Sequence, residues 1–239
     1  MTVETATTGM WVIGYGSLIF KPPPHYSLKV SGYLEGYIRR FWQSSTDHRG
    51  TKQSPGRVAT LVSLADLRKQ NKFHGDLHLY EFNEDDAASS GPIRDVALRV
   101  DEMKEEELKV WGVAYYIDPE NVAKVKEYLD IREKNGYTTH EVPFYIVNTH
   151  GTHPVLAQLP EKDGHTYIES MIYIGTIDNE SFVGPETVDE TAAVIRTSVG
   201  PSGPNIEYLV ELTKAVSELD PKGRSTDYYL EDLVQLAQK

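Results

Sequence analysis

Two short segments of the 239-residue chain carry the residue types that acid–base chemistry and anion binding need. The first is the turn Gly14–Tyr15–Gly16–Ser17–Leu18, which follows a short apolar run and whose backbone N–H groups can point outward toward an anion. The second is Glu133, which we expect in the last turn of a helix that Gly136 ends. The negative end of a helix raises the pKa of a partly buried carboxylate there, so Glu133 can act as a base near neutral pH.

Both segments also have a simpler interpretation. The turn lacks the third glycine of a dinucleotide fingerprint, because Ile19 stands there, and it lacks the glycines that flank the serine of a hydrolase elbow. An ordinary turn from a strand into a loop explains it from the residues alone. Glu133 is likewise explained as a solvated helix-end carboxylate that pairs with Arg132 or Lys134.

The composition excludes several kinds of site. Cysteine is absent, so the chain has no thiolate nucleophile, disulfide or zinc–thiolate site. The histidine pairs at positions 74 and 78 and at 150 and 153 lack a carboxylate in a metal-binding pattern, so we expect neither a metal nor a cofactor. The net charge of −12 repels phosphate backbones, which argues against a nucleic-acid partner.

The chain reads as that of a soluble cytoplasmic protein. It has no run of about 18 apolar residues, so no membrane partner is expected. The first nine residues lack the basic and apolar regions of a secretory signal. Five cationic residues cluster in one region of the sequence: Arg39, Arg40, Arg49, Lys52 and Arg57. They indicate either solvated strand ends or a surface that attracts an anionic small molecule.

The hydrophobic pattern predicts an α+β order, with strands first and helices last. Strands are expected at residues 10–13, 33–42, 57–62, 110–117, 142–147 and 167–176. A helix should begin at Asp118–Pro119 and end before Gly136. Three more are expected at about 187–199, 206–219 and 227–237.

Residues 63–109 look different from the rest. After position 82 the segment is acidic and lacks a strong apolar pattern, although residues 77–82 fit a further strand. We interpret residues 63–109 as a polar insertion. Part of residues 83–109 either forms a mobile cover near the mouth of the site or has no role at all.

Several motifs in order make the chain resemble the ChaC family of γ-glutamylcyclotransferases. No single motif is specific, but the ordered set is, and it spans nearly the whole chain outside residues 63–109 and the C-terminal helix. The motifs are WVIGYGSL (11–18), RRFWQ (39–43), STDHRG (45–50), PGRV (55–58), WGVAY (111–115), YLDIREKNGY (128–137), YIGTIDN (173–179), GPSG (200–203) and NIEYL (205–209).

The resemblance implies a single domain over residues 1–239, a small mixed β-barrel with helices packed around it. It also implies conversion of glutathione to 5-oxoproline and cysteinylglycine without a metal or cofactor. By resemblance, Tyr15, Gly16, Ser17 and Leu18 form the loop that binds the γ-glutamyl group. Glu133 is the catalytic acid/base, and Tyr208 contacts substrate.

Two other functions remain open at this point. The same chemistry would serve other γ-glutamyl amino acids or γ-glutamylamines. A barrel that kept the binding loop could also be a non-catalytic sensor of γ-glutamyl ligands, because a fold does not guarantee a function.

Overall fold

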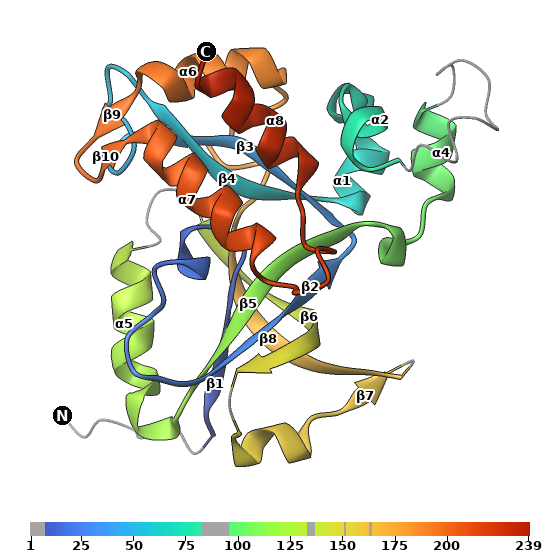
Figure 1. Ribbon diagram of the computed structural model, residues 1–239, viewed down its shortest axis with the longest axis vertical. Helices are drawn as coiled ribbons and strands as arrows, with labels where there is room; N and C mark the ends of the chain where they lie inside the picture. The colour runs from blue at the N-terminus through green and yellow to red at the C-terminus, as the bar shows by residue number, and fades with distance from the viewer. Residues whose placement is uncertain (1–7, 83–95, 133–136, 151, 163) are drawn as a thin grey trace.

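Five strands close into a small mixed barrel in the computed structural model, which describes residues 8–82, 96–132, 137–150, 152–162 and 164–239 (Figure 1). Around the ring the strands are β1 (Met10–Gly14), β5 (Lys109–Ile117), β2 (Tyr26–Glu35), β6 (Tyr137–His150) and β8 (His165–Gly175). Neighbours run antiparallel, and a parallel β8–β1 pairing closes the ring. A short outer strand, β7 (Glu161–Lys162), pairs with β8. The barrel and the α+β class confirm the prediction from the sequence.

A second, two-stranded sheet lies beside the barrel under three helices. It consists of β3 (Tyr37–Ser45) and β4 (Gly56–Ser63), paired antiparallel. Figure 1 shows the C-terminal helices over this sheet. They are α6 (Val188–Thr197), α7 (Asn205–Ser217) and α8 (Tyr228–Ala237), and the small hairpin of β9 (Val199–Gly200) and β10 (Gly203–Pro204) joins the first two.

One helix flanks the barrel on the other side. The 3-10 turn η4 (Pro119–Asn121) leads into α5 (Val122–Arg132), whose buried residues Val122, Val125 and Leu129 join the same core cluster as α7 and α8. The turn η1 (Ser17–Ile19) lies near it in Figure 1, and η5 (Pro154–Gln158) follows β6 along the chain. No helix in the part of the chain that the structure describes is long and apolar enough to span a membrane.

Residues 63–82 and 96–109 form a packed lobe of short elements. These are α1 (Leu64–Lys69), η2 (Asn71–His74), α2 (Leu77–Tyr80), α4 (Val96–Glu102) and η3 (Glu105–Glu107). Their apolar side chains pack with Trp42 of β3 in a separate core cluster that includes Leu67, Phe73, Val100 and Met103. This lobe lies on the opposite side of the molecule from α5 (Figure 1).

Two predictions about the elements are wrong. Residues 33–42 are not one strand, because Gly36 takes a positive φ of 78° that an ordinary strand residue avoids, and the chain turns there from β2 into β3. Residues 77–82 form a helical turn instead of a strand, because Leu77 is buried in the lobe and Tyr80 packs edge-on against Tyr229 of α8.

Candidate active site

The glycine turn leaves the end of β1 and enters η1. Two of its carbonyl oxygens accept hydrogen bonds from side chains of the barrel and its neighbouring sheet. Tyr15 O accepts from Arg39 Nε at 3.1 Å, and Leu18 O accepts from the Tyr115 hydroxyl at 2.9 Å. Burial raises the pKa of Tyr115, so its hydroxyl stays protonated and donates. The first N–H groups of η1 have no acceptor inside the turn, as at any helix start. The backbone of the turn is therefore fixed, with amide donors at its start.

A small recess of about 40 Å³ lies against this turn. All five residues that the sequence assigned to substrate binding line it: Tyr15, Gly16, Ser17, Leu18 and Tyr208. Tyr208 comes from α7, almost two hundred residues later, and a Cβ built on Gly16 would lie 3.1 Å from its hydroxyl oxygen. Two further tyrosines also line the recess, Tyr137 and Tyr173, to which the sequence analysis assigned no role.

The predicted acid/base, Glu133, lies outside the described residues. Its neighbour Arg132, the last residue of α5, donates to Ser17 Oγ at 2.8 Å and to Lys21 O at 3.1 Å. Arg132 therefore ties the end of α5 to the glycine turn. On the other side of the undescribed stretch 133–136, Tyr137 lines the recess.

A larger outer pocket of about 270 Å³ adjoins the recess, because Ser17, Tyr137 and Tyr208 line both. Among the described residues, three cations line it, Lys21, Arg49 and Arg132, against one carboxylate, that of Asp47. This positive character is opposite to the net charge of −12 of the whole chain. Recess and pocket together reach the lower end of the range for small-molecule sites, roughly 300–1,000 Å³.

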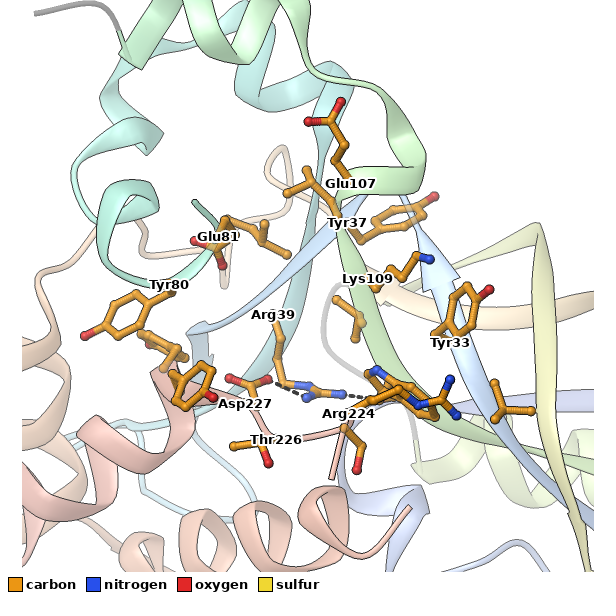
Figure 2. Close-up of a pocket in the computed structure, with 18 of the residues that line it drawn as sticks. Tyr33, Tyr37, Arg39, Tyr80, Glu81, Glu107, Lys109, Arg224, Thr226 and Asp227 are labelled. Atoms are coloured by element: carbon orange, nitrogen blue, oxygen red, sulfur yellow. Dashed lines mark hydrogen bonds and ion pairs between the residues drawn. The ribbon is translucent and has the colours of Figure 1, made fainter. Parts of the chain in front are cut away.

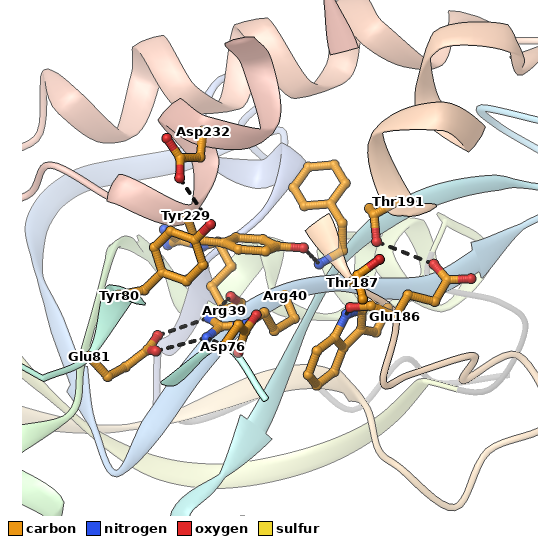
Figure 3. A network of polar contacts seen from close by, with 12 residues as sticks. Arg39, Arg40, Asp76, Tyr80, Glu81, Glu186, Thr187, Thr191, Tyr229 and Asp232 are labelled. Atoms are coloured by element: carbon orange, nitrogen blue, oxygen red, sulfur yellow. Dashed lines mark hydrogen bonds and ion pairs between the residues drawn. The ribbon is translucent and has the colours of Figure 1, made fainter. Parts of the chain in front are cut away.

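Most of the cationic group noted in the sequence is buried and paired. Arg40 binds both Asp76 and Glu81, each through two hydrogen bonds of 2.8–2.9 Å (Figure 3). Arg57 pairs with Glu186 in the same bidentate way, at 2.6 and 2.8 Å. The sequence suggested either solvated strand ends or attraction of an anionic small molecule. Neither interpretation fits Arg40 and Arg57, because both form ion pairs that join different parts of the chain. Only Arg49 of the group lines the outer pocket.

A more spacious cleft, about 630 Å³, lies elsewhere, between β2, β5, the lobe and the start of α8 (Figure 2). Arg39 crosses its floor with one nitrogen on Asp227 and another on Trp111 O. The buried Glu81 carboxylate borders it, and burial raises the pKa of Glu81 to about 7, although Arg40 opposes that shift. Its arginines, Arg39, Arg40 and Arg224, are all held in ion pairs within the protein. Of residues 63–109, Tyr80, Glu81 and residues 107–109 line this cleft, and none of the described ones lines the recess or the outer pocket. The cover was predicted within residues 83–109, of which 83–95 lie outside the described residues, so it stays a prediction.

Among the described residues no three metal-binding side chains gather in one place. His74 is buried and hydrogen-bonded to Leu67 O at 2.7 Å, and His150 bonds Ser31 Oγ at 2.9 Å. These two histidines therefore serve the packing of the fold.

Comparisons with known proteins point to one family. The profile of the family described as ChaC-like protein matches residues 10–239. The glutathione-specific γ-glutamylcyclotransferase of Saccharomyces cerevisiae is 47% identical over 97% of both chains. Glutathione-specific γ-glutamylcyclotransferase 1 of Homo sapiens is 30% identical over 90% of this chain and 73% of its own. A crystal structure of the glutathione-specific yeast cyclotransferase, labelled with selenomethionine, superposes with a TM-score of 0.81 at 44% identity, over 97% of this chain and 96% of that one.

Proposed function

Because the chain belongs to the ChaC-like family, we propose that it is a γ-glutamylcyclotransferase that converts glutathione to 5-oxoproline and cysteinylglycine. One observation carries the proposal: the turn of residues 15–18 and the distant Tyr208 meet at one recess, which opens into a cation-lined pocket. Glutathione is an anion with a compact γ-glutamyl end and a dipeptide tail. Recess and pocket offer a matching pair of compartments.

The chemistry requires proton transfer and no external nucleophile. The α-amine of the γ-glutamyl group attacks its own γ-carbonyl, a five-membered ring closes, and the C–N bond to cysteine breaks. The amine attacks only after its ammonium form has lost a proton, and the leaving amine of cysteinylglycine must gain one. One carboxylate can do both in turn, and Glu133 is the residue proposed for it. A chain without cysteine is compatible with this route.

The remaining site residues hold the substrate in its ring-closing geometry. The turn at Gly16–Leu18 offers backbone amides for the α-carboxylate or for the negative charge that develops on the γ-carbonyl oxygen. Tyr15 and Tyr208 wall the recess, and Tyr208 accepts a weak hydrogen bond from Ala59 N at 3.4 Å. Tyr173 donates to Asp130 Oδ1 at 3.1 Å and so links β8 to α5. Holding amine and carbonyl in contact lowers the entropic part of the barrier.

The test is turnover of glutathione by the purified protein and by Glu133→Gln. The wild type should release 5-oxoproline and cysteinylglycine. The amide variant should fold normally and lose about 10²–10⁴-fold in kcat, the range for a lost general acid–base. Near wild-type turnover by Glu133→Gln would show that another group moves the protons. Binding of glutathione without any product would identify a sensor.

Substrate preference is measured in the same assay. Glutathione should be turned over with a higher kcat/KM than γ-glutamyl-alanine, because the outer pocket has room for a second residue after the γ-glutamyl group. A preference for γ-glutamyl-alanine or for γ-glutamylamines would instead place the chain among cyclotransferases of broader substrate range. We also propose that the enzyme acts in the cytoplasm, without nucleic acid, membrane or cofactor.

A further inference from the structure

We propose that the outer pocket binds the cysteinylglycine half of glutathione and that Lys21 pairs with its glycine carboxylate. This subsite rests on the proposed cyclotransferase function. A substrate whose γ-glutamyl group fills the recess must send the rest of its chain past the shared wall residues Ser17, Tyr137 and Tyr208. The tail therefore enters the outer pocket.

The charge of the outer pocket matches this tail. Beyond the γ-amide the tail carries one full charge, the glycine carboxylate. The part of the pocket wall that the structure describes presents three cations against one carboxylate, in a chain of net charge −12. A local cationic surface in an acidic protein draws anions and fixes their orientation.

Two of the three cations are already engaged. The Arg49 side chain is 5% exposed, donates to Pro204 O at 2.9 Å and pairs with Glu207 at 3.6 Å. Arg132 donates hydrogen bonds to Ser17 Oγ, Lys21 O and the Tyr128 hydroxyl. Both guanidinium groups are thus held in place by the protein, and they shape the pocket.

Lys21 is different. It is exposed, and among the residues that the structure describes its ammonium has neither a hydrogen bond nor an ion pair; its neighbour is the Phe20 ring, 5.7 Å away. Its backbone N–H bonds Ser17 O at 2.8 Å, which fixes the start of its side chain one turn beyond the recess. A flexible lysine with unused donors, anchored at the pocket, suits a carboxylate that arrives with the substrate.

The distances are of the right scale. Two residues of extended chain span about 7 Å, which separates the scissile amide of glutathione from its terminal carboxylate. The hydrogen bond from Lys21 N to Ser17 O is of the α-helical type, and four residues of such a turn rise about 6 Å, which is the scale of the separation between Ser17 and Lys21. The carboxylate of a γ-glutamyl amino acid ends one residue earlier, about 3.5 Å short. Lys21 would therefore favour glutathione over these shorter compounds.

Glutathione and its glycine ethyl ester, which lacks the carboxylate charge, test the subsite. The variants are Lys21→Met, which removes the cation, and Lys126→Met, a matched change at an exposed α5 lysine outside both pockets. For the wild type and Lys126→Met, kcat/KM should be higher for glutathione than for the ester. Lys21→Met should lower kcat/KM for glutathione about tenfold, mostly through KM, and change that for the ester less than about twofold; a charge-assisted contact of this kind is worth up to 10²-fold.

The outcomes separate the subsite from the proposed function. Equal effects of Lys21→Met on both substrates, or no effect on either, would overturn the pairing of Lys21 with the carboxylate while the wild type still makes 5-oxoproline. Lys21→Arg should restore most of the preference for glutathione. If the wild type releases no 5-oxoproline from glutathione, the proposed function falls and the subsite falls with it.

Discussion

The ion pair of Arg39 and Asp227 joins parts of the chain that lie 188 residues apart, at 2.6 Å (Figure 2). The Arg39 side chain is 2% exposed and that of Asp227 20%. The second oxygen of Asp227 accepts from Leu230 N at 3.1 Å and so caps α8. Arg39 also donates to Tyr15 O, which ties this pair to the glycine turn. The Asp227 carboxylate therefore both pairs with a buried guanidinium group and caps the start of α8.

We expect Asp227→Asn to lower the free energy of unfolding by about 3 kcal/mol. Removing one partner of a buried ion pair costs roughly 3–5 kcal/mol, and the partial exposure of Asp227 places the loss at the lower end. Asparagine has one oxygen, which can accept either from Arg39 or from the helix start. Asp227→Ala removes both acceptors and should cost about 1 kcal/mol more, the usual value of a helix cap.

The measurement is urea unfolding followed by circular dichroism at neutral pH. Glu106→Gln is the matched control, because Glu106 pairs with Lys104 at 3.7 Å on the surface, where both side chains are more than 60% exposed. That change should cost less than about 1 kcal/mol. The reasoning is refuted if Asp227→Asn lies within about 1 kcal/mol of the wild type, or if Asp227→Asn and Glu106→Gln cost the same.

Two further predictions concern pH and metals. Burial raises the pKa of Glu81 to about 7 in the folded protein, above its ordinary value of 4.5, so the folded state binds the extra proton between these values. The free energy of unfolding should therefore fall as pH rises from about 5 to about 8, and Glu81→Gln should flatten this dependence in urea unfolding at the two pH values; the same slope in both proteins would contradict it. Turnover of glutathione should be unchanged by EDTA, and a loss that one divalent metal restores would show a metal requirement.

The sequence predicted best those elements whose signals are local. The short apolar run before Gly14 and the β-branched run at 110–117 form β1 and β5. The helical segment begins at Asp118–Pro119 as predicted, with one turn of 3-10 helix that leads into α5. At the C-terminal helices the predicted bounds differ from α6, α7 and α8 by at most two residues. Here the residues that decide the structure stand next to one another in the chain.

The candidate site could be assembled from the sequence only through the resemblance. No local sequence signal connects the glycine turn to Tyr208 on α7 or to Tyr173 on β8. Tyr173 reaches the turn because β1 and β8 are neighbours in the barrel, and Tyr208 reaches it because α7 packs on η1. Two cations of the outer pocket were missed for a related reason, whereas Arg49 belongs to the cationic group noted in the sequence. Lys21 and Arg132 stand at the ends of a turn and a helix, where a charged residue ordinarily indicates contact with solvent.

Residues 63–109 show the limit of pattern reading most plainly. Elements of four to seven residues are too short to display a helical period, and helices of that length have little stability of their own. Leu67 and Phe73 precede the stretch 83–95, and Val100 and Met103 follow it, yet all four are buried in one cluster with Trp42. A linker in place of residues 83–109 would remove Val100, Met103 and Leu108 from that cluster, and its effect on turnover would mix folding with function. A replacement confined to residues 83–95 keeps these contacts, so it alone can separate a role in turnover from a role in folding.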